Sequence, residues 1–577
     1  MRLRSQSWFD GDNDVAVENR AALHAAGLPD SRGDGQPRPV VAILISSSDL
    51  NPCNLPLQGK VDAVRRGVYE AGGVPVELPV MSLGEDLMKP TAMLYRNLLA
   101  MEVEEYIRSN PVDAVVLMGN CDKTVPGLLM GAASAGLPGV LVTGGYRRPG
   151  RVAGRPLAAG VDLWRYWEQR RAGKVDDGTW AQVEQALGCS QGACNVMGTA
   201  MTMAIIAEAM GLMIPGTATL AFDDPQLTDA ATEAGRRAVA LATNGPTISE
   251  ILTPAAFANA LTVLAAVGGS TNAIVHLCAL AGRRNIPLPL EAFDAAAHRV
   301  PVLVDVLPGG RAGIAAFDAA GGVPVLLREL AEIIDFDVPT VTGTLRAAPP
   351  DPDIGNSGST AIRTWAEPVA PVGSLAVVRG NITPHGAVLK VSAATPALLH
   401  HRGPAVVFAS YQDMLDQIDD PELEVSADSV LVLTGAGPRG GDGFPEWGML
   451  PIPAKLAAQG VTDMVRISDA RMSGTSYGTC VLHISPEAAV GGPLAAVRTG
   501  DTICLDVPNR RLDVELPQTD IDARLAHWRA PVSRHVRGWP LLYQQHVLQA
   551  PQGADFDFLR ADTDEALHFV PPVVGRS

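Results

Sequence analysis

The sequence predicts an α/β fold, with an N-terminal open, mainly parallel sheet domain followed by a C-terminal β-barrel-like domain. Short apolar runs alternate with helical segments after residue 38, a segment rich in Pro, Gly and Ser follows at 346–373, and beyond it the apolar period falls towards two. We therefore divide the chain into an N-terminal arm, an α/β domain, a linker and a β-rich domain. Their predicted boundaries are 1–37, 38–345, 346–373 and 374–577.

Repeated strand and helix units are the pattern of the first domain. Continuous apolar runs such as VVAILIS are typical of strands that are buried on both faces of a parallel sheet. Each run alternates with a segment of helical spacing. The predicted order is strand 40–46, helix 59–73, strand 74–80, helix 90–110, strand 112–118, helix 126–136 and strand 138–145, with later helices at 199–213 and 253–269.

Seven short valine-rich runs, separated by turn residues, predict the strands of the second domain. This spacing is typical of a barrel or a sandwich with a few helices. The predicted strands are 374–380, 386–392, 404–410, 429–435, 463–468, 479–484 and 501–507.

Composition limits the partners that the protein can have. The 577 residues carry a formal charge of −17 with no basic stripe, which argues against nucleic acid and anionic membranes and favours a small molecule. The N-terminus lacks an apolar segment of signal-peptide length, and no run of about 18 apolar residues occurs, so we expect a cytoplasmic protein. Seven scattered cysteines without a CxxC pair indicate reduced thiols.

Three cysteines occupy comparable places in the predicted sheet domain. Cys53 and Cys121 each follow a strand, where ligands collect in parallel sheets, and Cys194 immediately precedes a helix whose N-terminus favours a thiolate. A lone cysteine is more often a small buried hydrophobe, but three at such places favour a shared site. Cys189 competes with Cys194, which is better placed beside the helix. The other thiols are interpreted as packing residues: Cys278, Cys480 and Cys504.

Three soft ligands without a fourth indicate an iron–sulfur cluster with one open iron position. Asp122 beside Cys121, and Glu85 after the strand at 74–80, offer the oxygen ligands that Mg²⁺ prefers. The alternatives are a helix N-cap for Asp122 and a solvated loop for Glu85. Lys123 either pairs with Asp122 or, after capture of CO₂, becomes a carbamate ligand, and the residues alone leave both open.

Six stretches resemble one enzyme family, in the family's order, from about residue 38 to about residue 540. They are GNCDKTVPGLLMGAAS, GACNVMGTAMTMA, AVGGSTNAIVHL, SLGEDLMKPTAMLYRN, RGNITPHGAVLK and DARMSGTSYGT. The family is that of the dihydroxy-acid and sugar-acid (aldonate) dehydratases, which includes 6-phosphogluconate dehydratase.

The resemblance implies two cofactors, a [2Fe–2S] cluster and Mg²⁺, in a homodimer or homotetramer. The implied cluster ligands are Cys53, Cys121 and Cys194. The implied Mg²⁺ ligands are Glu85, Asp122, a carbamylated Lys123 and Glu446 of GFPEWG. Ser473 of RMSGT is implied as the base, although RMSGTSYGT by itself is typical of a turn between strands.

Four further residues are candidates for contact with the substrate. Thr475 has a hydroxyl that can hydrogen-bond the substrate or Ser473, and Arg471 has donors for an anion. The others, Ser270 and Thr271, lie in a Gly-rich turn that we expect near the substrate.

The implied activity is that of a hydro-lyase that removes water from a 2,3-dihydroxy acid and yields a 2-keto-3-deoxy acid. The form MSGTSYGT resembles the sugar-acid branch, whose substrates are pentonates and hexonates. One alternative is the dihydroxy-acid dehydratase of branched-chain amino-acid synthesis. A non-catalytic iron–sulfur sensor is the other, and it has no need of three carboxylates around a second metal.

Overall fold

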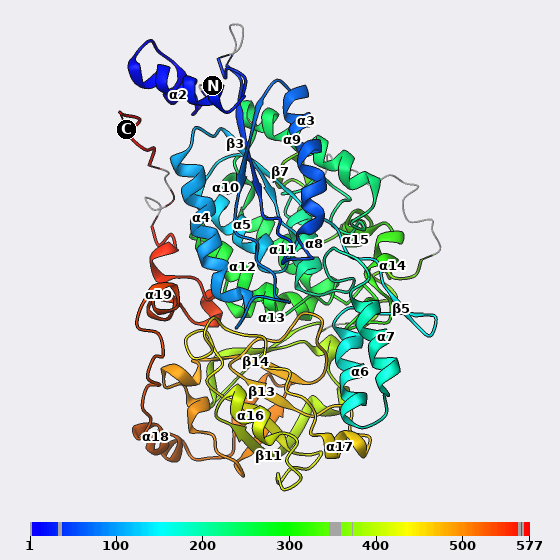
Figure 1. The fold of residues 1–577 in the computed structure, drawn as a ribbon. Helices are drawn as coiled ribbons and strands as arrows, with labels where there is room; N and C mark the ends of the chain where they lie inside the picture. The colour runs from blue at the N-terminus through cyan, green and yellow to red at the C-terminus, as the bar shows by residue number, and fades with distance from the viewer. Residues whose placement is uncertain are drawn as a thin grey trace.

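The computed structural model describes residues 3–32, 37–345, 359–371, 373–563, 567 and 570–576. An α/β domain forms the upper part of the view in Figure 1 and a β-barrel the lower part. This order of a parallel sheet followed by a barrel confirms the predicted fold class. No helix in these described ranges has the length and apolar character needed to span a membrane.

Four parallel strands form the sheet, in the order β2-β1-β3-β4. Their bounds are β1 Val40–Ile45, β2 Val74–Pro79, β3 Ala114–Met118 and β4 Gly139–Val142. Every residue of β1, β3 and β4 is buried. In the edge strand β2, the last four residues are alternately partly buried and exposed. The continuous apolar runs of the sequence therefore reflect strands that are covered on both faces.

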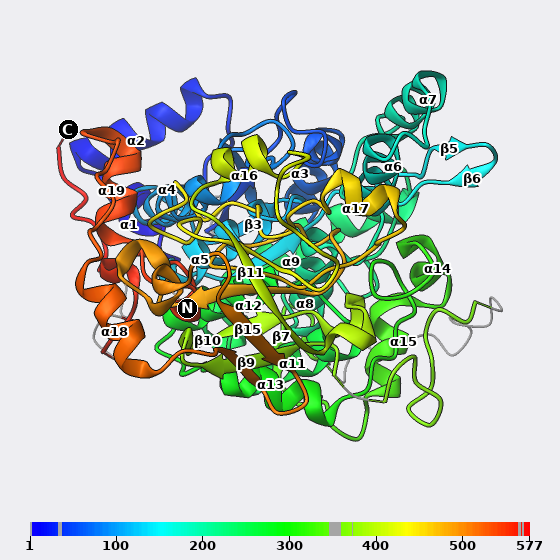
Figure 2. The ribbon, with the colours of Figure 1, turned by 90° about the horizontal axis from the view of Figure 1, so that it is seen from below.

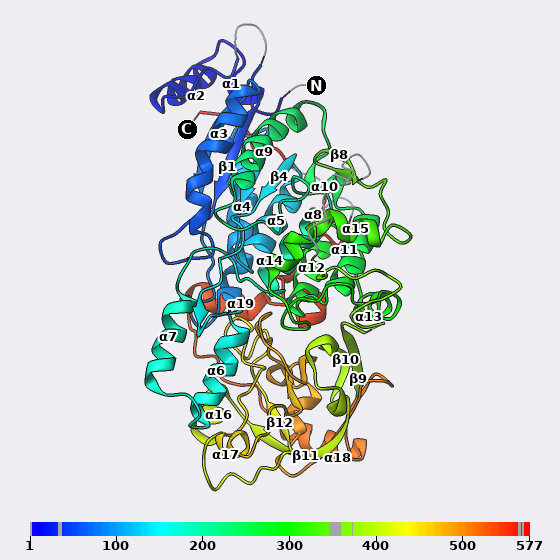
Figure 3. The same ribbon diagram turned by 90° about the vertical axis from the view of Figure 1, so that its right-hand side faces the viewer.

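Two helix pairs cover the sheet. The helix α3, Val61–Glu70, packs on α9, Pro225–Asn244, and α4, Arg96–Ser109, packs on α5, Thr124–Ala135. Because βαβ crossovers are right-handed, the change of direction after β2 places α3 and α4 on opposite faces. Figure 3 shows α3 and α9 side by side.

Three apolar helices form a further layer of the α/β domain, in which two pack on α5 and the third packs on those two. They are α8 Thr199–Ala209, α11 Pro254–Ala266 and α12 Asn272–Gly282. All residues of α8 and α12 are buried, which explains why neither helix has a polar face. Further helices of this part of the chain are α1 Gln6–Phe9, α2 Asp14–Ala25, α10 Ile248–Ile251, α13 Leu290–Arg299, α14 Ile314–Ala319 and α15 Gly322–Glu329.

A helical hairpin reaches from the α/β domain down the side of the barrel (Figures 1 and 2). It consists of α6, Val161–Arg171, and α7, Asp177–Leu187. Arg171 at the end of α6 donates to the carbonyl of Ile452 at 2.9 Å and forms an ion pair with Asp419. The short strands β5 Arg151–Val152 and β6 Arg155–Pro156 precede it, and β7 Pro339–Thr340 pairs with β8 Gly343–Thr344 further on.

Eight strands close the barrel, in the order β10-β14-β13-β12-β11-β15-β16-β9. Their bounds are β9 Ala376–Gly380, β10 Thr383–Leu389, β11 His400–Phe408, β12 Val430–Leu433, β13 Arg466–Ser468, β14 Cys480–Ser485, β15 Thr502–Asp506 and β16 Arg511–Val514. All seven predicted strands are present. The eighth, β16, was missed because its four residues include only two apolar ones.

Alternation along the strands gives the barrel two packing surfaces. Val378 and Leu389 point into the barrel core, whereas their neighbours Val377 and Val388 belong to the core of the α/β domain. On another side, the short helices α16 Tyr411–Gln417 and α17 Ala454–Ala458 cover the barrel (Figure 2). The two domains thus share one continuous apolar interface.

The chain returns to the α/β domain after the barrel. Beyond α18, Gln518–Ala526, and α19, Gly538–His546, the Arg96 guanidinium donates to the carbonyls of Gly553 and Ala554 at 2.8 and 2.9 Å. The buried Arg283 pairs with Asp555 at 2.6 Å. The C-terminal segment therefore ties the two domains together along the side that is drawn in red in Figure 1.

Candidate active site between the two domains

The loops after all four parallel strands meet at one edge of the sheet. Crossovers leave β1 and β3 in opposite directions, so the crevice between these two strands is the place where ligands bind in open parallel sheets. Cys53 follows β1, Glu85 follows β2, the run from Cys121 to Lys123 follows β3, and Arg147 follows β4. The topology therefore brings residues from four distant segments together.

Buried amides join the loops that carry the first two thiols. The Asn54 side-chain oxygen accepts from the backbone N–H groups of Asn120 and Cys121 at 3.0 and 2.8 Å. Asn120 in turn donates to the carbonyl of Cys53 at 2.7 Å. A side-chain hydrogen bond with Cys53 and burial raise the pKa of the Cys121 thiol well above its ordinary value.

A backbone hydrogen bond places the Cys194 segment at the same edge of the sheet. Gly192 donates to the carbonyl of Pro52 at 2.9 Å, which joins the Cys194 segment to the Cys53 loop. The prediction that Cys194 immediately precedes a helix was wrong, because α8 begins only at Thr199. Burial raises the pKa of Cys194 to about 11, although the Arg147 guanidinium 3.4 Å away acts in the other direction.

The remaining thiols lie elsewhere. Cys189 is exposed, and its sulfur lies 3.6 Å from the carbonyl of Arg148. Cys278 and Cys480 are buried in the apolar core, as predicted. For Cys504 the packing prediction was wrong: the side chain is partly exposed beside Glu515, with Sγ 3.0 Å from a carboxylate oxygen.

Three carboxylates and one lysine form what we call the acid cluster, which consists of Glu85, Asp122, Lys123 and Glu446. One oxygen from each carboxylate lies within 4.8 Å of the other two. The fully buried Lys123 Nζ lies 3.1 Å from Glu85 and 2.6 Å from Glu446, and it also contacts Asp122. Residues from both domains therefore share this cluster, since Glu446 lies between β12 and β13.

Opposing effects set the charges of the acid cluster. Burial and Arg471 act to lower the pKa of Lys123, but the three carboxylates outweigh them and hold it above its ordinary value. Burial acts to raise the pKa of Glu446, yet Lys123 and Arg471 bring it down to about 2. Burial raises the pKa of Glu85, against the effect of Lys123. Cations thus balance a group of partly buried carboxylates.

A second group of buried residues orients the carboxylates. Arg471 and Asn272 donate to the same Glu446 oxygen at 2.8 and 2.9 Å. The Thr91 hydroxyl donates to Glu85 at 2.7 Å and accepts from Arg471 at 3.2 Å. Reasoning from the sequence missed Asn272 and Thr91. The contacts of Asn272 with Glu446 and of Thr91 with Arg471 join the two domains, and no local sequence pattern indicates them.

Arg471 was predicted to bind the substrate, and the structure places it inside the protein. Its side chain is fully buried, and besides Glu446 and Thr91 it donates from Nε to the carbonyl of Phe444 at 2.6 Å. All three nitrogens thus have protein partners, and the predicted contact with substrate stays a prediction.

The loop that carries Ser473 lies between β13 and β14 and packs on the start of α8. Ser473 Oγ is half-buried, 2.9 Å from Thr475 Oγ1. A Cβ added to Gly474 would lie 2.4 Å from the backbone nitrogen of Thr199, the first residue of α8. The N-terminal end of a helix favours negative charge, so the loop lies where an anion is stabilised.

Ser270 and Thr271 are buried behind this loop. The Ser270 hydroxyl lies 2.9 Å from that of Thr199 and accepts from the backbone N–H of Asn272 at 3.2 Å. These bonds fix the start of α8 and the residue that orients Glu446. Their predicted contact with the substrate remains a prediction.

Soft and hard donors meet where Cys121 joins Asp122. The Cys121 sulfur lies 3.5 Å from an Asp122 oxygen, so one of the three thiols is a direct neighbour of the acid cluster. Sulfur donors suit iron, and clustered carboxylate oxygens suit Mg²⁺. The donor sets therefore fit both cofactors that the family resemblance implies.

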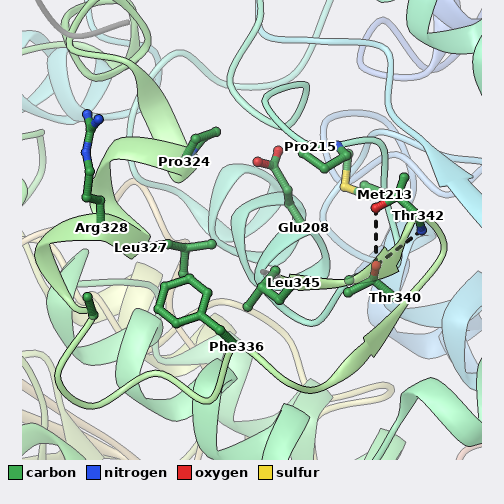
Figure 4. Close-up of a pocket in the computed structure, with 12 residues that line it drawn as sticks. Glu208, Met213, Pro215, Pro324, Leu327, Arg328, Phe336, Thr340, Thr342 and Leu345 are labelled. Atoms are coloured by element: carbon green, nitrogen blue, oxygen red, sulfur yellow. Dashed lines mark hydrogen bonds between the residues drawn. The ribbon is translucent and has the colours of Figure 1, made fainter. Parts of the chain in front are cut away.

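An apolar cavity of about 140 Å³ lies apart from this site, between α8 and α15 (Figure 4). Met213, Leu327 and Phe336 are among its lining residues, and none of the predicted site residues is. Burial raises the pKa of Glu208 at its wall to about 7, and its carboxylate accepts from the backbone N–H groups of residues 216–218. Glu208 thus holds a loop, and we assign the cavity no role.

Comparison with known proteins identifies the family. The profile "Dihydroxy-acid/6-phosphogluconate dehydratase N-terminal" matches residues 38–348, and the profile of the C-terminal part matches residues 360–554. The chain is 46% identical over 568 residues to a 6-deoxy-6-sulfo-D-gluconate dehydratase of Pseudomonas putida, covering 97% of this chain and 96% of the relative. It is 44% identical over 561 residues to an L-arabinonate dehydratase of Rhizobium leguminosarum, covering 97% and 96%.

A more distant relative is the dihydroxy-acid dehydratase of Sulfurisphaera tokodaii, 34% identical over 547 residues, with 93% of this chain and 96% of the relative covered. The similarity in each case extends over both domains. The chain belongs to the dihydroxy-acid/6-phosphogluconate dehydratase family and is a dehydratase, a hydro-lyase.

Proposed function

We propose that this dehydratase removes water from a sugar acid, a pentonate or hexonate, and forms a 2-keto-3-deoxy acid, with an iron–sulfur cluster and Mg²⁺ as cofactors. One observation carries the choice of substrate: the relatives named for sugar acids are more similar to this chain than the dihydroxy-acid dehydratases are. The MSGTSYGT form of the Ser473 loop supports the same choice.

The donor sets support the assignment of cofactors. Cys53, Cys121 and Cys194 would hold a [2Fe–2S] cluster with one open iron position, because three soft ligands leave the fourth place free. Glu85, Asp122 and Glu446 would hold Mg²⁺. The Lewis acidity that dehydration needs, at the departing hydroxide and at the developing enolate, comes from these two centres when bound.

The role of Lys123 in the acid cluster depends on whether its side chain is an ammonium or a carbamate. As an ammonium it balances the three carboxylates. If the amine instead loses a proton and adds CO₂, it becomes a carbamate and a further oxygen donor. Its burial among ligands at the domain interface supports a role as a ligand.

Ser473 is the base in this proposal. A serine hydroxyl is too weakly basic at neutral pH unless its alkoxide is stabilised. The N-terminal end of α8 beside Gly474 contributes to that stabilisation, and Thr475 holds the Ser473 oxygen through a 2.9 Å hydrogen bond. Ser473 then takes the proton from C2 of the substrate while the hydroxyl leaves C3, and the enol formed tautomerises to the keto acid.

The decisive experiment is a substrate panel. Protein purified without oxygen is supplied with Mg²⁺ and pentonates, hexonates or 2,3-dihydroxyisovalerate, and 2-keto acids are measured as semicarbazones. We expect the highest kcat/KM with one of the sugar acids. Exclusive turnover of 2,3-dihydroxyisovalerate contradicts the choice of substrate, and absence of any keto acid contradicts the proposed reaction.

Three variants separate the proposed roles. Cys121→Ser is expected to lose the visible absorbance of the cluster together with activity. Ser473→Ala is expected to retain the absorbance and lose turnover, and retained activity removes Ser473 from the role of base. Cys189→Ser changes an exposed thiol and serves as the matched control, with absorbance and activity unchanged. Light scattering on the same samples tests the expected homodimer or homotetramer.

A further inference from the structure

A guanidinium lies directly against one of the proposed cluster ligands. Arg147 Nη2 donates to Cys194 Sγ at 3.4 Å, and Nη1 donates to the carbonyl of Leu187 at 3.2 Å. Nε is buried and has no hydrogen-bond partner within the described part of the chain. Among the described residues, the guanidinium therefore has two hydrogen-bond partners, the Cys194 sulfur and the Leu187 carbonyl.

The backbone holds Arg147 in this place. Its N–H donates to the carbonyl of Ala193 at 2.8 Å, and Ala193 donates to the carbonyl of Gly145 at 3.0 Å. Gly192 allows the close approach, since an added Cβ would lie 2.7 Å from the Arg147 nitrogen. The loop after β4 and the Cys194 segment are thus paired, so the contact between guanidinium and sulfur follows from the fold.

Its neighbour in the sequence shows the contrast. Arg148 is half exposed, and its Nε forms a 2.9 Å ion pair with Asp223, itself half exposed. Ion pairs of this kind contribute little to stability. The two consecutive arginines therefore differ in surroundings while sharing charge and size, which makes Arg148 a matched control.

We propose that Arg147 is a positioning residue for the iron–sulfur cluster, which it serves by orienting the Cys194 sulfur and offsetting the negative charge of the three thiolates. The inference rests on the cluster assignment in the proposed function. Hydrogen bonds to ligand sulfurs are among the features that set the reduction potential of such clusters, and groups that orient ligands typically change metal affinity 10–100-fold when they are removed. The planar guanidinium holds its donors in a fixed fork, whereas the lysine ammonium is a compact charge on a flexible stem.

The test compares Arg147→Met, Arg147→Lys and Arg148→Met with the wild type, all prepared without oxygen. Iron and sulfide per chain, the visible spectrum, the half-life of the absorbance in chelator and the midpoint potential are measured. We expect Arg147→Met to lose its cluster about tenfold faster and to have a more negative potential. Arg147→Lys should be intermediate, and Arg148→Met should match the wild type.

Two results overturn the inference while leaving the proposed function intact. One is a cluster in Arg147→Met with the half-life and potential of the wild type. The other is a raised KM in both Arg147 variants with an unchanged cluster, which assigns the guanidinium to the substrate instead. Thermal unfolding of the cluster-free proteins identifies a variant that fails to fold, in which case Arg147→Lys decides. A wild-type protein that takes up no iron and sulfide overturns the proposed function as well.

Discussion

Replacing Lys390 by Met should stabilise the protein, because this lysine is a charge without a partner in the interior. It lies one residue beyond β10 with 1% of its surface exposed, and its Nζ has no hydrogen-bond partner within the described ranges. Burial lowers its pKa from 10.5 to about 7. At about 1.4 kcal/mol for each pKa unit, this difference corresponds to roughly 5 kcal/mol of lost stability at low pH.

The effect of Lys390 on the free energy of unfolding should depend on pH. Between pH 7 and 10.5 the unfolded chain keeps a proton on Lys390 that the folded chain has released, so the free energy of unfolding rises with pH in this window. Below pH 7 the destabilisation is complete, and above 10.5 it vanishes. The advantage of Lys390→Met should therefore be largest near pH 6.5 and shrink towards pH 10.

Thermal unfolding followed by circular dichroism at pH 6.5 and pH 9.5 measures this effect. Lys174→Met, at an exposed position, is the control and should change the midpoint little at either pH. A Lys390→Met protein that unfolds below the wild type, with the same difference at both pH values, would falsify the reasoning, because it would mean that the ammonium has a stabilising partner in solution.

Two further changes test the site. Thr91→Val removes the hydroxyl that forms hydrogen bonds with both Glu85 and Arg471. We expect the Mg²⁺ concentration for half-maximal activity to rise about tenfold or more. An unchanged dependence of activity on Mg²⁺ contradicts the role given to Thr91. Gly160→Ala places a Cβ 1.9 Å from the Thr475 hydroxyl, so turnover should fall by at least about tenfold while the visible absorbance stays. Gly154→Ala has a similar positive φ but open space around it, and should retain activity, so equal losses in both variants point to backbone strain instead.

Much of the fold is visible in the sequence because it depends on local patterns. The strands β1, β3 and β4 are continuous apolar runs since both of their faces are buried. In the barrel, β15 alternates between buried and partly exposed residues since only one of its faces meets the barrel core. The strand β16 escaped notice because four residues with two apolar side chains carry no periodic signal. It is held by its pairing with β15 and β9, which lie elsewhere in the sequence.

Some residues of the candidate site could likewise be proposed from the sequence pattern, and others could not. Cys53 and Cys121 could be proposed from their places after strands, because a parallel sheet collects such loops at one edge. Glu446 entered only through the family resemblance, since nothing in the barrel domain's own pattern points to the sheet. Thr91, Asn272 and Arg147 were not singled out at all.

The linear pattern of apolar, polar and reactive residues predicts the order of strands and helices. It also predicts which reactive side chains lie at the ends of these elements. Which side chains touch was decided by the docking of the barrel on the sheet. That docking buries Lys123 and Arg471 against Glu446, and a buried charge acquires its pKa and its orientation from neighbours far away in the chain. Such partners are set by three-dimensional packing, and no spacing along the chain encodes them.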